Sequence, residues 1–185
     1  FYADEANIRA VPNYGMMPKE VRCALIEKAA GAAEGSVTFL FQGGEPTLAG
    51  LDFYREFVSQ VRRTAPPGLA VQYAIQTNGM RLDEEWCRFF RGNRFLVGLS
   101  LDGNRACHDR FRRDAAGRGT YDRVRQAARL LDRAGVEYNI LTVVTGYLAR
   151  HIQSVFSALC RDGFSYQQYI PCLDPLEQDR GGERF

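Results

Sequence analysis

The amino-acid sequence predicts an α/β protein whose parallel strands form a barrel or a partial barrel. The first observation is that short apolar runs alternate strictly with stretches of helical periodicity, which indicates a parallel sheet with right-handed crossovers. The second is that nearly every expected strand ends in Gly together with Gln, Glu, Asn, Ser or Asp. Parallel barrels build their active sites from the loops after many strands, whereas open sheets use one switch point. Because several strands contribute here, we favour the barrel over the open sheet.

The first predicted pair of elements is a helix at residues 18–33 and a strand at residues 37–41. Pro18 suits the first position of a helix, and Gly35 follows the last turn. The run at 37–41 is apolar and β-branched, too short for a helix and long enough for a buried strand. The apolar residues that lie roughly on one face of the helix are Val21, Leu25, Ala29 and Ala32.

The remaining elements continue the alternation. Apolar residues at helical spacing mark the helices, which end at Gly or Pro. In the helix at 51–63 the predicted core-facing stripe is Tyr54, Phe57, Val58 and Val61. Asp83 and Thr120 stand where N-cap residues are expected. Residues 104–119, rich in Arg, Asp and Gly, are expected to form a long loop. In order, we expect a helix at 51–63, a strand at 70–76, a helix at 84–91, a strand at 95–99, a helix at 121–134, a strand at 136–144, a helix at 152–162 and a strand at 165–170.

The overall composition is that of an ordinary soluble globular protein. The chain of 185 residues is 45% hydrophobic and 25% charged, which suffices for a buried core and favours one domain over residues 1–185. A net charge of +2 is too small to indicate a nucleic-acid partner. No stretch approaches the ~18 apolar residues that span a bilayer, and no signal peptide is visible. We therefore expect a cytoplasmic protein that contacts neither nucleic acid nor membrane.

The five cysteines predict neither a disulfide framework nor a self-contained metal site, because their number is odd and no two have CxxC spacing. Cys23, Cys87 and Cys160 fall within expected helices and are interpreted as small buried hydrophobes. Cys172 follows the last expected strand, has no cysteine near it in the sequence, and is not interpreted as a metal ligand.

The stretch most indicative of a binding site is Q-G-G-E-P at residues 42–46, directly after the strand at 37–41. Gly43 and Gly44 permit positive φ and let a ligand approach the main chain, and Glu45 adds a carboxylate. Carbonyls, N–H groups and one anion together suit a ligand with a cationic amine. A plain turn after a strand fits the same residues. A phosphate site on the two glycines is disfavoured, because Glu45 would repel an anion.

Motifs that follow one another along the chain give it a resemblance to a known family. The combination resembles the radical S-adenosylmethionine (SAM) enzymes and is most similar to the anaerobic sulfatase-maturating enzymes. The resemblance covers nearly the whole chain. The motifs are F-Q-G-G-E-P-T-L at 41–48, Q-T-N-G at 76–79, L-S-L-D-G at 99–103 with His108-Asp109 and Arg112 after it, E-Y-N-I-L-T-V-V at 137–144, and I-P-C-L-D-P at 170–175.

The resemblance implies a partial (β/α)6 barrel of the radical SAM type, of which residues 1–185 are a partial core domain. It also implies two cofactors, SAM and a [4Fe–4S] cluster. In the family, the first strand leads to a C-x-x-x-C-x-x-C loop that holds the cluster, and an aromatic pair follows, which Phe1-Tyr2 resembles. The first strand and the cluster ligands are therefore expected upstream of Phe1, and the family's two further clusters beyond the last residue. This fragment alone is expected to be inactive.

The family's cofactor contacts correspond to eight residues of this sequence. Gly43, Gly44 and Glu45 resemble the motif that holds the methionine amino group. Ser100 would bond to the cofactor's polar edge, and Arg112 would pair with its carboxylate through two parallel hydrogen bonds. Two further residues would flank the adenine, and one would touch cofactor or substrate. The full set is Tyr2 and Leu173 at the adenine, Gln42 at cofactor or substrate, Ser100 at the polar edge of the cofactor, and Gly43, Gly44, Glu45 and Arg112 at the methionine part. No catalytic residue and no metal ligand is identified.

Several of these positions also fit ordinary structural roles. Taken without the family, Arg112 is a surface arginine in an Arg-rich loop. Asn78 and Asp102 would cap neighbouring turns. His108 is interpreted as a hydrogen-bonding residue that orders its loop rather than as a base, and His151 as a surface residue.

By resemblance, the reaction is oxidation of a Cys or Ser side chain of a sulfatase polypeptide to Cα-formylglycine. It proceeds through a 5′-deoxyadenosyl radical, and a ferredoxin or flavodoxin would donate the electrons. The cofactor carries the difficult chemistry, and the protein supplies position and shielding. Two alternatives stay open: another radical SAM enzyme that modifies peptides, and a catalytically incomplete barrel that acts only as a binding domain.

Overall fold

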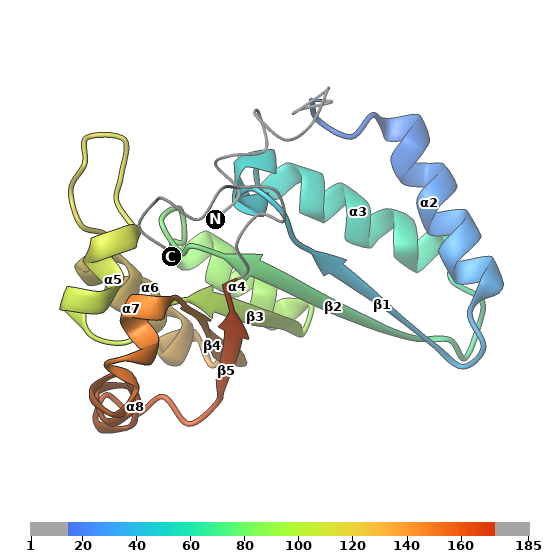
Figure 1. Ribbon diagram of the computed structural model, residues 1–185. Coiled ribbons are helices and arrows are strands. Elements are labelled where there is room, and N and C mark those ends of the chain that lie inside the picture. The colour runs from blue at the N-terminus through green and yellow to red at the C-terminus, as the bar shows by residue number, and fades with distance from the viewer. Residues whose placement is uncertain (1–14, 173–185) are drawn as a thin grey trace, which may run out of the picture.

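A computed structural model describes residues 15–172 as a curled sheet of parallel strands with helices packed against it (Figure 1). The strand order is β1-β2-β3-β4-β5, so each strand pairs with its neighbours in the sequence. An open doubly wound sheet reverses its strand order at a switch point. This sheet does not, and the predicted partial barrel is confirmed. The strands are β1 (Ser36–Phe41), β2 (Ala70–Thr77), β3 (Phe95–Ser100), β4 (Tyr138–Val144) and β5 (Gln167–Pro171).

Helix α2 (Lys19–Ala32) precedes β1, and each of the other helices lies between two consecutive strands, as crossover connections between parallel strands require. The helices expected from apolar spacing form within two residues of the expected bounds. After α2 they are α3 (Leu51–Thr64), α4 (Glu84–Gly92), α6 (Tyr121–Ala134) and α8 (Ile152–Arg161). Three short helices were not expected: the 3-10 helix η1 (Pro46–Ala49), α5 (Arg105–Phe111) and α7 (Gly146–Ala149).

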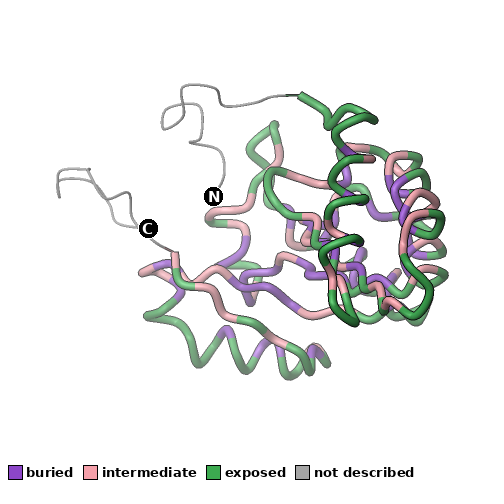
Figure 2. The backbone as a smooth tube through the Cα atoms, turned by 90° about the vertical axis from the view of Figure 1, so that its right-hand side faces the viewer, coloured by how far each residue is buried: buried purple, intermediate pink, exposed green. Residues whose placement is uncertain are grey.

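The two faces of the sheet have different surroundings. Residues paired across neighbouring strands share a face, so the register places Phe39, Tyr73 and Phe95 together on the face that the helices bury. On the opposite, concave face, Leu40 and Leu96 are 52% and 46% exposed. Figure 2 shows buried segments gathered along the middle of the molecule and exposed ones on the outer turns of the helices. The concave face is therefore the interior of a half-barrel.

Helix α3 fixes the exit of β1. Its predicted core stripe is confirmed, because Tyr54, Phe57, Val58 and Val61 are all buried. The ring of Phe41, the last residue of β1, lies 4.9 Å from the rings of both Tyr54 and Phe57. The hydroxyl of Tyr54 donates to the carbonyl of Pro46 at 2.7 Å, and burial, with the charge of Glu45, raises the pKa of that hydroxyl. The core thus holds the chain on both sides of the glycine turn.

Helix α2 turns a different face to the core from the one that its apolar stripe indicated. Val21 and Leu25 are 52% and 40% exposed, whereas Arg22, Ile26 and Ala30 are buried. The guanidinium of Arg22 forms an ion pair with Glu56 at 2.5 Å and lies over the Phe53 ring at 5.3 Å, both on α3. The contact with α3 decides which side is buried, and an arginine with a long aliphatic stem can occupy it.

The expected long loop at 104–119 contains helix α5, which the sequence analysis missed. Asn104 begins it, since its side chain accepts a hydrogen bond from the Cys107 N–H at 3.1 Å. After α5, a single antiparallel bridge joins Arg113 to Gly119. Thr120 precedes α6 as predicted, but its hydroxyl makes no cap to that helix. That hydroxyl instead donates a hydrogen bond to the Arg112 carbonyl at 3.0 Å.

The prediction for the cysteines is confirmed only in part. Cys87 is buried, Cys23 is half-buried and Cys160 is exposed. Helix α8 turns Val155, Ala158 and Leu159 inward, which leaves Cys160 on its outer side. Within residues 15–172 no group of three or more His, Cys, Asp or Glu side chains is arranged to hold a metal ion.

None of the helices in this part of the chain is both long and apolar enough to cross a membrane.

Candidate functional site

The carboxyl end of β1 opens into a turn that only glycine adopts without strain. Gly43 and Gly44 have φ of 98° and 58°, in the left-handed region. A Cβ built on either residue would meet no atom within 4 Å. Both glycines are exposed. The main chain here is accessible to a ligand, as the sequence predicted.

The carboxylate of Glu45 joins the end of β1 to the end of β2. Its Oε1 accepts hydrogen bonds from the Thr47 N–H at 3.1 Å, the Thr47 hydroxyl at 2.5 Å and the Thr77 hydroxyl at 2.7 Å. Its Oε2 accepts from the Asn78 N–H at 2.8 Å. The carboxylate therefore shapes the loop and at the same time places a negative charge beside the accessible glycines.

Asp102 makes the corresponding connection between β3 and β4. Its side chain is 2% exposed, and its Oδ1 accepts from the Val143 N–H at 2.8 Å. The guanidinium of Arg112 binds the same carboxylate twice, with Nε at 2.5 Å from Oδ2 and Nη2 at 3.2 Å from Oδ1. The Arg112 side chain is only 18% exposed. The interpretation of Arg112 as a solvated surface arginine is therefore wrong.

His108 lies behind this ion pair and is fully buried. Its Nδ1 accepts a hydrogen bond from the Asp102 N–H at 3.1 Å. The hydrogen of the neutral ring is thus assigned to Nε2, which lies 3.0 Å from the Thr120 hydroxyl. Burial lowers the pKa of His108 to about 3, and the positive charge of Arg112 acts in the same direction. The prediction that His108 orders its loop rather than acting as a base is supported by these contacts.

The other predicted positions are distributed around the same strand ends. Ser100 is the last residue of β3 and is half-buried, and Gln42 is exposed after β1. The Asn78 side chain accepts from the Met80 N–H at 2.9 Å, which is the turn cap that the sequence allowed. His151 is exposed, as expected. Tyr2 and Leu173 lie outside the described residues.

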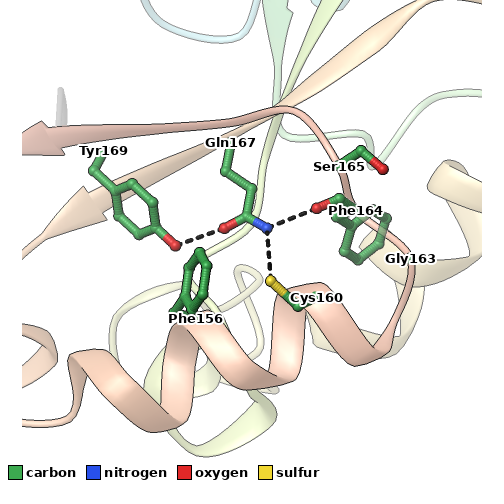
Figure 3. A pocket seen from close by; sticks show the side chains of 7 residues that line it. All are labelled: Phe156, Cys160, Gly163, Phe164, Ser165, Gln167 and Tyr169. Atoms are coloured by element: carbon green, nitrogen blue, oxygen red, sulfur yellow. Dashed lines mark hydrogen bonds between the residues drawn. The ribbon is translucent and has the colours of Figure 1, made fainter.

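Two hollows in the described part of the chain are lined by residues other than those of the glycine turn, Asp102 and Arg112. One, of about 380 Å³, lies between β5 and α8 (Figure 3). There the Gln167 amide donates to the Phe164 carbonyl at 2.6 Å and accepts from the Tyr169 hydroxyl at 2.6 Å. A larger hollow, of about 880 Å³, lies at the amino ends of β4 and β5. Charged groups converge instead at the strand ends, around Glu45, Asp102 and Arg112, and there we place the candidate functional site.

Comparison with known proteins agrees with the resemblance. The family model for the radical SAM superfamily matches residues 3–159. The cysteine-type anaerobic sulfatase-maturating enzyme of Clostridium novyi (strain NT) is 43% identical over 180 residues, which are 97% of this chain and 48% of that enzyme. The serine-type enzyme of Klebsiella aerogenes is 38% identical over 153 residues, 83% of this chain and 37% of that enzyme. The chain therefore spans about half the length of the curated relatives it matches, or less.

Solved structures give the same result. The structure of native anSMEcpe with bound AdoMet and Kp18Cys peptide covers 97% of this chain with a TM-score of 0.90 at 39% identity, and the match spans 49% of that chain. Streptococcus suis SuiB covers 89% of this chain with a TM-score of 0.61 at 15% identity, over 36% of its own length. The second likeness is one of fold alone.

Proposed function

The chain belongs to the radical SAM superfamily, and on that premise we propose that it is part of an enzyme that oxidises a Cys or Ser of a sulfatase polypeptide to Cα-formylglycine. The observation that carries the proposal is the near-complete match of this chain to native anSMEcpe with bound AdoMet and a peptide. The relatives named anaerobic sulfatase-maturating enzymes support the same reaction.

The strand ends fit the methionine part of SAM, which carries one cationic amine and one carboxylate. The open turn at Gly43 and Gly44, with the Glu45 charge beside it, offers main-chain carbonyls to the amine. Arg112 offers a guanidinium to the carboxylate, and its direction is fixed by Asp102. Ser100 would bond to the polar edge of the cofactor, and Gln42 would contact cofactor or substrate. When bound beside a reduced [4Fe–4S] cluster, SAM supplies a 5′-deoxyadenosyl radical.

The cluster would take its ligands from outside the described residues, since no suitable group of side chains occurs within them. We propose that residues 1–185 are a partial core domain and that they do not cleave SAM by themselves. Tyr2 and Leu173 are proposed to flank the adenine. The protein's role toward the cofactor is thus to bind it, orient it and exclude water around it.

The proposed substrate is a sulfatase polypeptide. Cysteine-type and serine-type relatives are 43% and 38% identical to this chain, so both target residues belong to the proposal. The electron donor is proposed to be a ferredoxin or a flavodoxin, and the compartment the cytoplasm. Both follow from the family resemblance.

The test uses the whole protein that contains this chain, purified without oxygen and supplied with iron and sulfide. We expect 5′-deoxyadenosine under dithionite, and we expect a sulfatase-derived peptide to gain an aldehyde that forms a hydrazone. If 5′-deoxyadenosine forms while the Cys and Ser peptides stay unchanged, the proposed sulfatase substrate is wrong, and other peptides become the substrates to test. If iron is bound and SAM is not cleaved, the proposal fails.

A further inference from the structure

His108, Asp102, Arg112 and Thr120 form a closed ring of hydrogen bonds behind the strand ends. The Asp102 N–H donates to His108 Nδ1 at 3.1 Å, and His108 Nε2 lies 3.0 Å from the Thr120 hydroxyl. That hydroxyl donates to the Arg112 carbonyl at 3.0 Å. The Arg112 guanidinium closes the ring on the Asp102 carboxylate. The ring joins three elements: the end of β3, helix α5 and the start of α6.

Each ring nitrogen of His108 has a defined partner, so its tautomer is fixed. A protonated imidazole would point an N–H at the Asp102 N–H, and two donors cannot bond to each other. The lowered pKa of His108 agrees with a ring that stays neutral. Its polar neighbours are the charged pair Asp102–Arg112 and the hydroxyl of Thr120, and the Tyr121 ring lies 5.9 Å from it.

The closed ring of hydrogen bonds controls the position of Arg112. Arg112 is the C-cap of α5, and its N–H donates to the His108 carbonyl at 2.9 Å. Its own carbonyl accepts from both the N–H and the hydroxyl of Thr120, at 3.3 and 3.0 Å. The main chain of Arg112 is therefore bound on both sides by residues of the ring, while Asp102 aligns its side chain.

Asp109 supports the same connection from the next position. Its carboxylate accepts from the Tyr121 N–H at 2.9 Å, at the first residue of α6. It packs so closely on Gly119 that a Cβ there would lie 2.2 Å from the Asp109 Cγ. The pair His108-Asp109 thus ties α5 to residues 119–121. This gives a physical reason for the spacing of His108, Asp109 and Arg112 in the sequence.

We propose that His108 is a neutral positioning residue that, through Thr120 and Asp102, holds Arg112 in place to receive a carboxylate ligand, the amino-acid end of SAM. The inference rests on the proposed function, since it assigns Arg112 to the cofactor carboxylate. His108 contacts the residues that hold Arg112 and is given no role in transferring protons.

The test compares two ligands on the whole reconstituted protein. SAM carries the amino-acid end, whereas 5′-methylthioadenosine keeps the adenosine and lacks that end. His108→Leu removes the hydrogen bonds of both imidazole nitrogens at similar side-chain volume. We expect it to weaken SAM binding by about tenfold, the order of one or two lost buried hydrogen bonds. Binding of 5′-methylthioadenosine should stay within about twofold. His108→Asn, whose oxygen can again accept from the Asp102 N–H, should recover part of the SAM affinity.

A second variant keeps the proposal testable if His108→Leu does not fold. Thr120→Val removes only the hydroxyl that links His108 to the Arg112 carbonyl. It should weaken SAM binding several-fold and leave 5′-methylthioadenosine binding nearly unchanged. Iron content and far-ultraviolet circular dichroism report folding and loading. Unchanged SAM affinity in folded His108→Leu or Thr120→Val, or equal weakening for both ligands, would overturn the inference.

Two further controls separate this inference from the proposed function. If the unmodified protein does not bind SAM in preference to 5′-methylthioadenosine, the proposed function itself fails at this site. If it does, and Arg112→Gln abolishes the preference while the His108 and Thr120 variants retain it, only the positioning role is wrong.

Discussion

The carboxylate of Glu45 accepts the backbone N–H of Asn78 at 2.8 Å, across 33 positions of the chain. A residue that follows β1 thereby holds the residue that follows β2. Asp102, after β3, accepts the N–H of Val143 on β4 at the same distance. Both carboxylates are oriented by their neighbouring strand, and each lies beside a group proposed to meet the cofactor.

Glu45→Gln should loosen the turn at the end of β1. An amide keeps one oxygen acceptor and turns an NH2 group toward the donors of Thr47, Thr77 or Asn78, so at least one hydrogen bond is lost. We expect a loss of about 1–3 kcal/mol in the free energy of unfolding, together with weaker SAM binding. Urea unfolding and equilibrium dialysis measure the two effects.

Glu85→Gln is the matched control for Glu45→Gln. Its side chain is 54% exposed and pairs with Arg55 on the surface, so the same chemical change should alter unfolding by no more than about 1 kcal/mol. Equal effects at the two positions would contradict the structural role of Glu45.

Gly43→Ala and Gly44→Ala should each destabilise the protein by roughly 1–2 kcal/mol, because L-residues adopt a left-handed backbone at that cost. There is open space above both residues, so backbone conformation and not a clash is responsible. Gly31→Ala is the control: Gly31 lies within α2, has no positive φ and meets no atom within 4 Å. It should stabilise the protein by about 0.5–1 kcal/mol. If thermal unfolding shows the same change in stability for all three variants, the left-handed backbone of Gly43 and Gly44 is not the cause.

Asp102→Asn should be the most damaging of these changes. It removes the negative charge that pairs with the guanidinium of Arg112, whose side chain is 18% exposed. Breaking a buried ion pair in this way costs about 3–5 kcal/mol. Asp122→Asn, at a 76% exposed carboxylate paired with Arg105, should cost no more than about 1 kcal/mol. The comparison is made by urea unfolding, and a small effect at Asp102 would show that the pair is not a structural requirement.

His108 should stay neutral in the folded protein down to about pH 5, because burial, with the Arg112 charge, lowers its pKa to about 3. The unfolded chain takes up a proton on this residue as the pH falls through about 6.5. Stability is therefore full above that pH and falls below it, by about 2 kcal/mol between roughly pH 7.5 and pH 5.

Nuclear magnetic resonance of carbon-labelled histidine measures this directly. The His108 signal, assigned by its disappearance in His108→Asn, should not shift between about pH 7.5 and pH 5, and the variant should lose part of the pH dependence of unfolding. A titration of His108 near the ordinary value for histidine would refute the prediction.

Local patterns in the sequence predicted most of the elements but not all of their orientations. The stripe Tyr54, Phe57, Val58 and Val61 was correct because α3 lies directly on β1 and must bury its one apolar side. The stripe on α2 was wrong because its contact with α3 admits the stem of Arg22. Helix α5 was missed because its short run of polar residues has no apolar period, and only the Asn104 cap indicates its start.

The assignment of residues to the cofactor remains a prediction that the binding experiments test.

The sequence by itself determined the parallel alternation and the glycine turn at Gly43 and Gly44, because periodicity and backbone freedom depend on residues close in the chain. The tertiary structure alone decided the partners of Glu45, Asp102 and His108. The register of neighbouring strands aligns Phe41 with Ile75 and Leu99 with Ile140. That alignment brings together groups 33 and 41 positions apart, at separations where no local pattern in the sequence carries information.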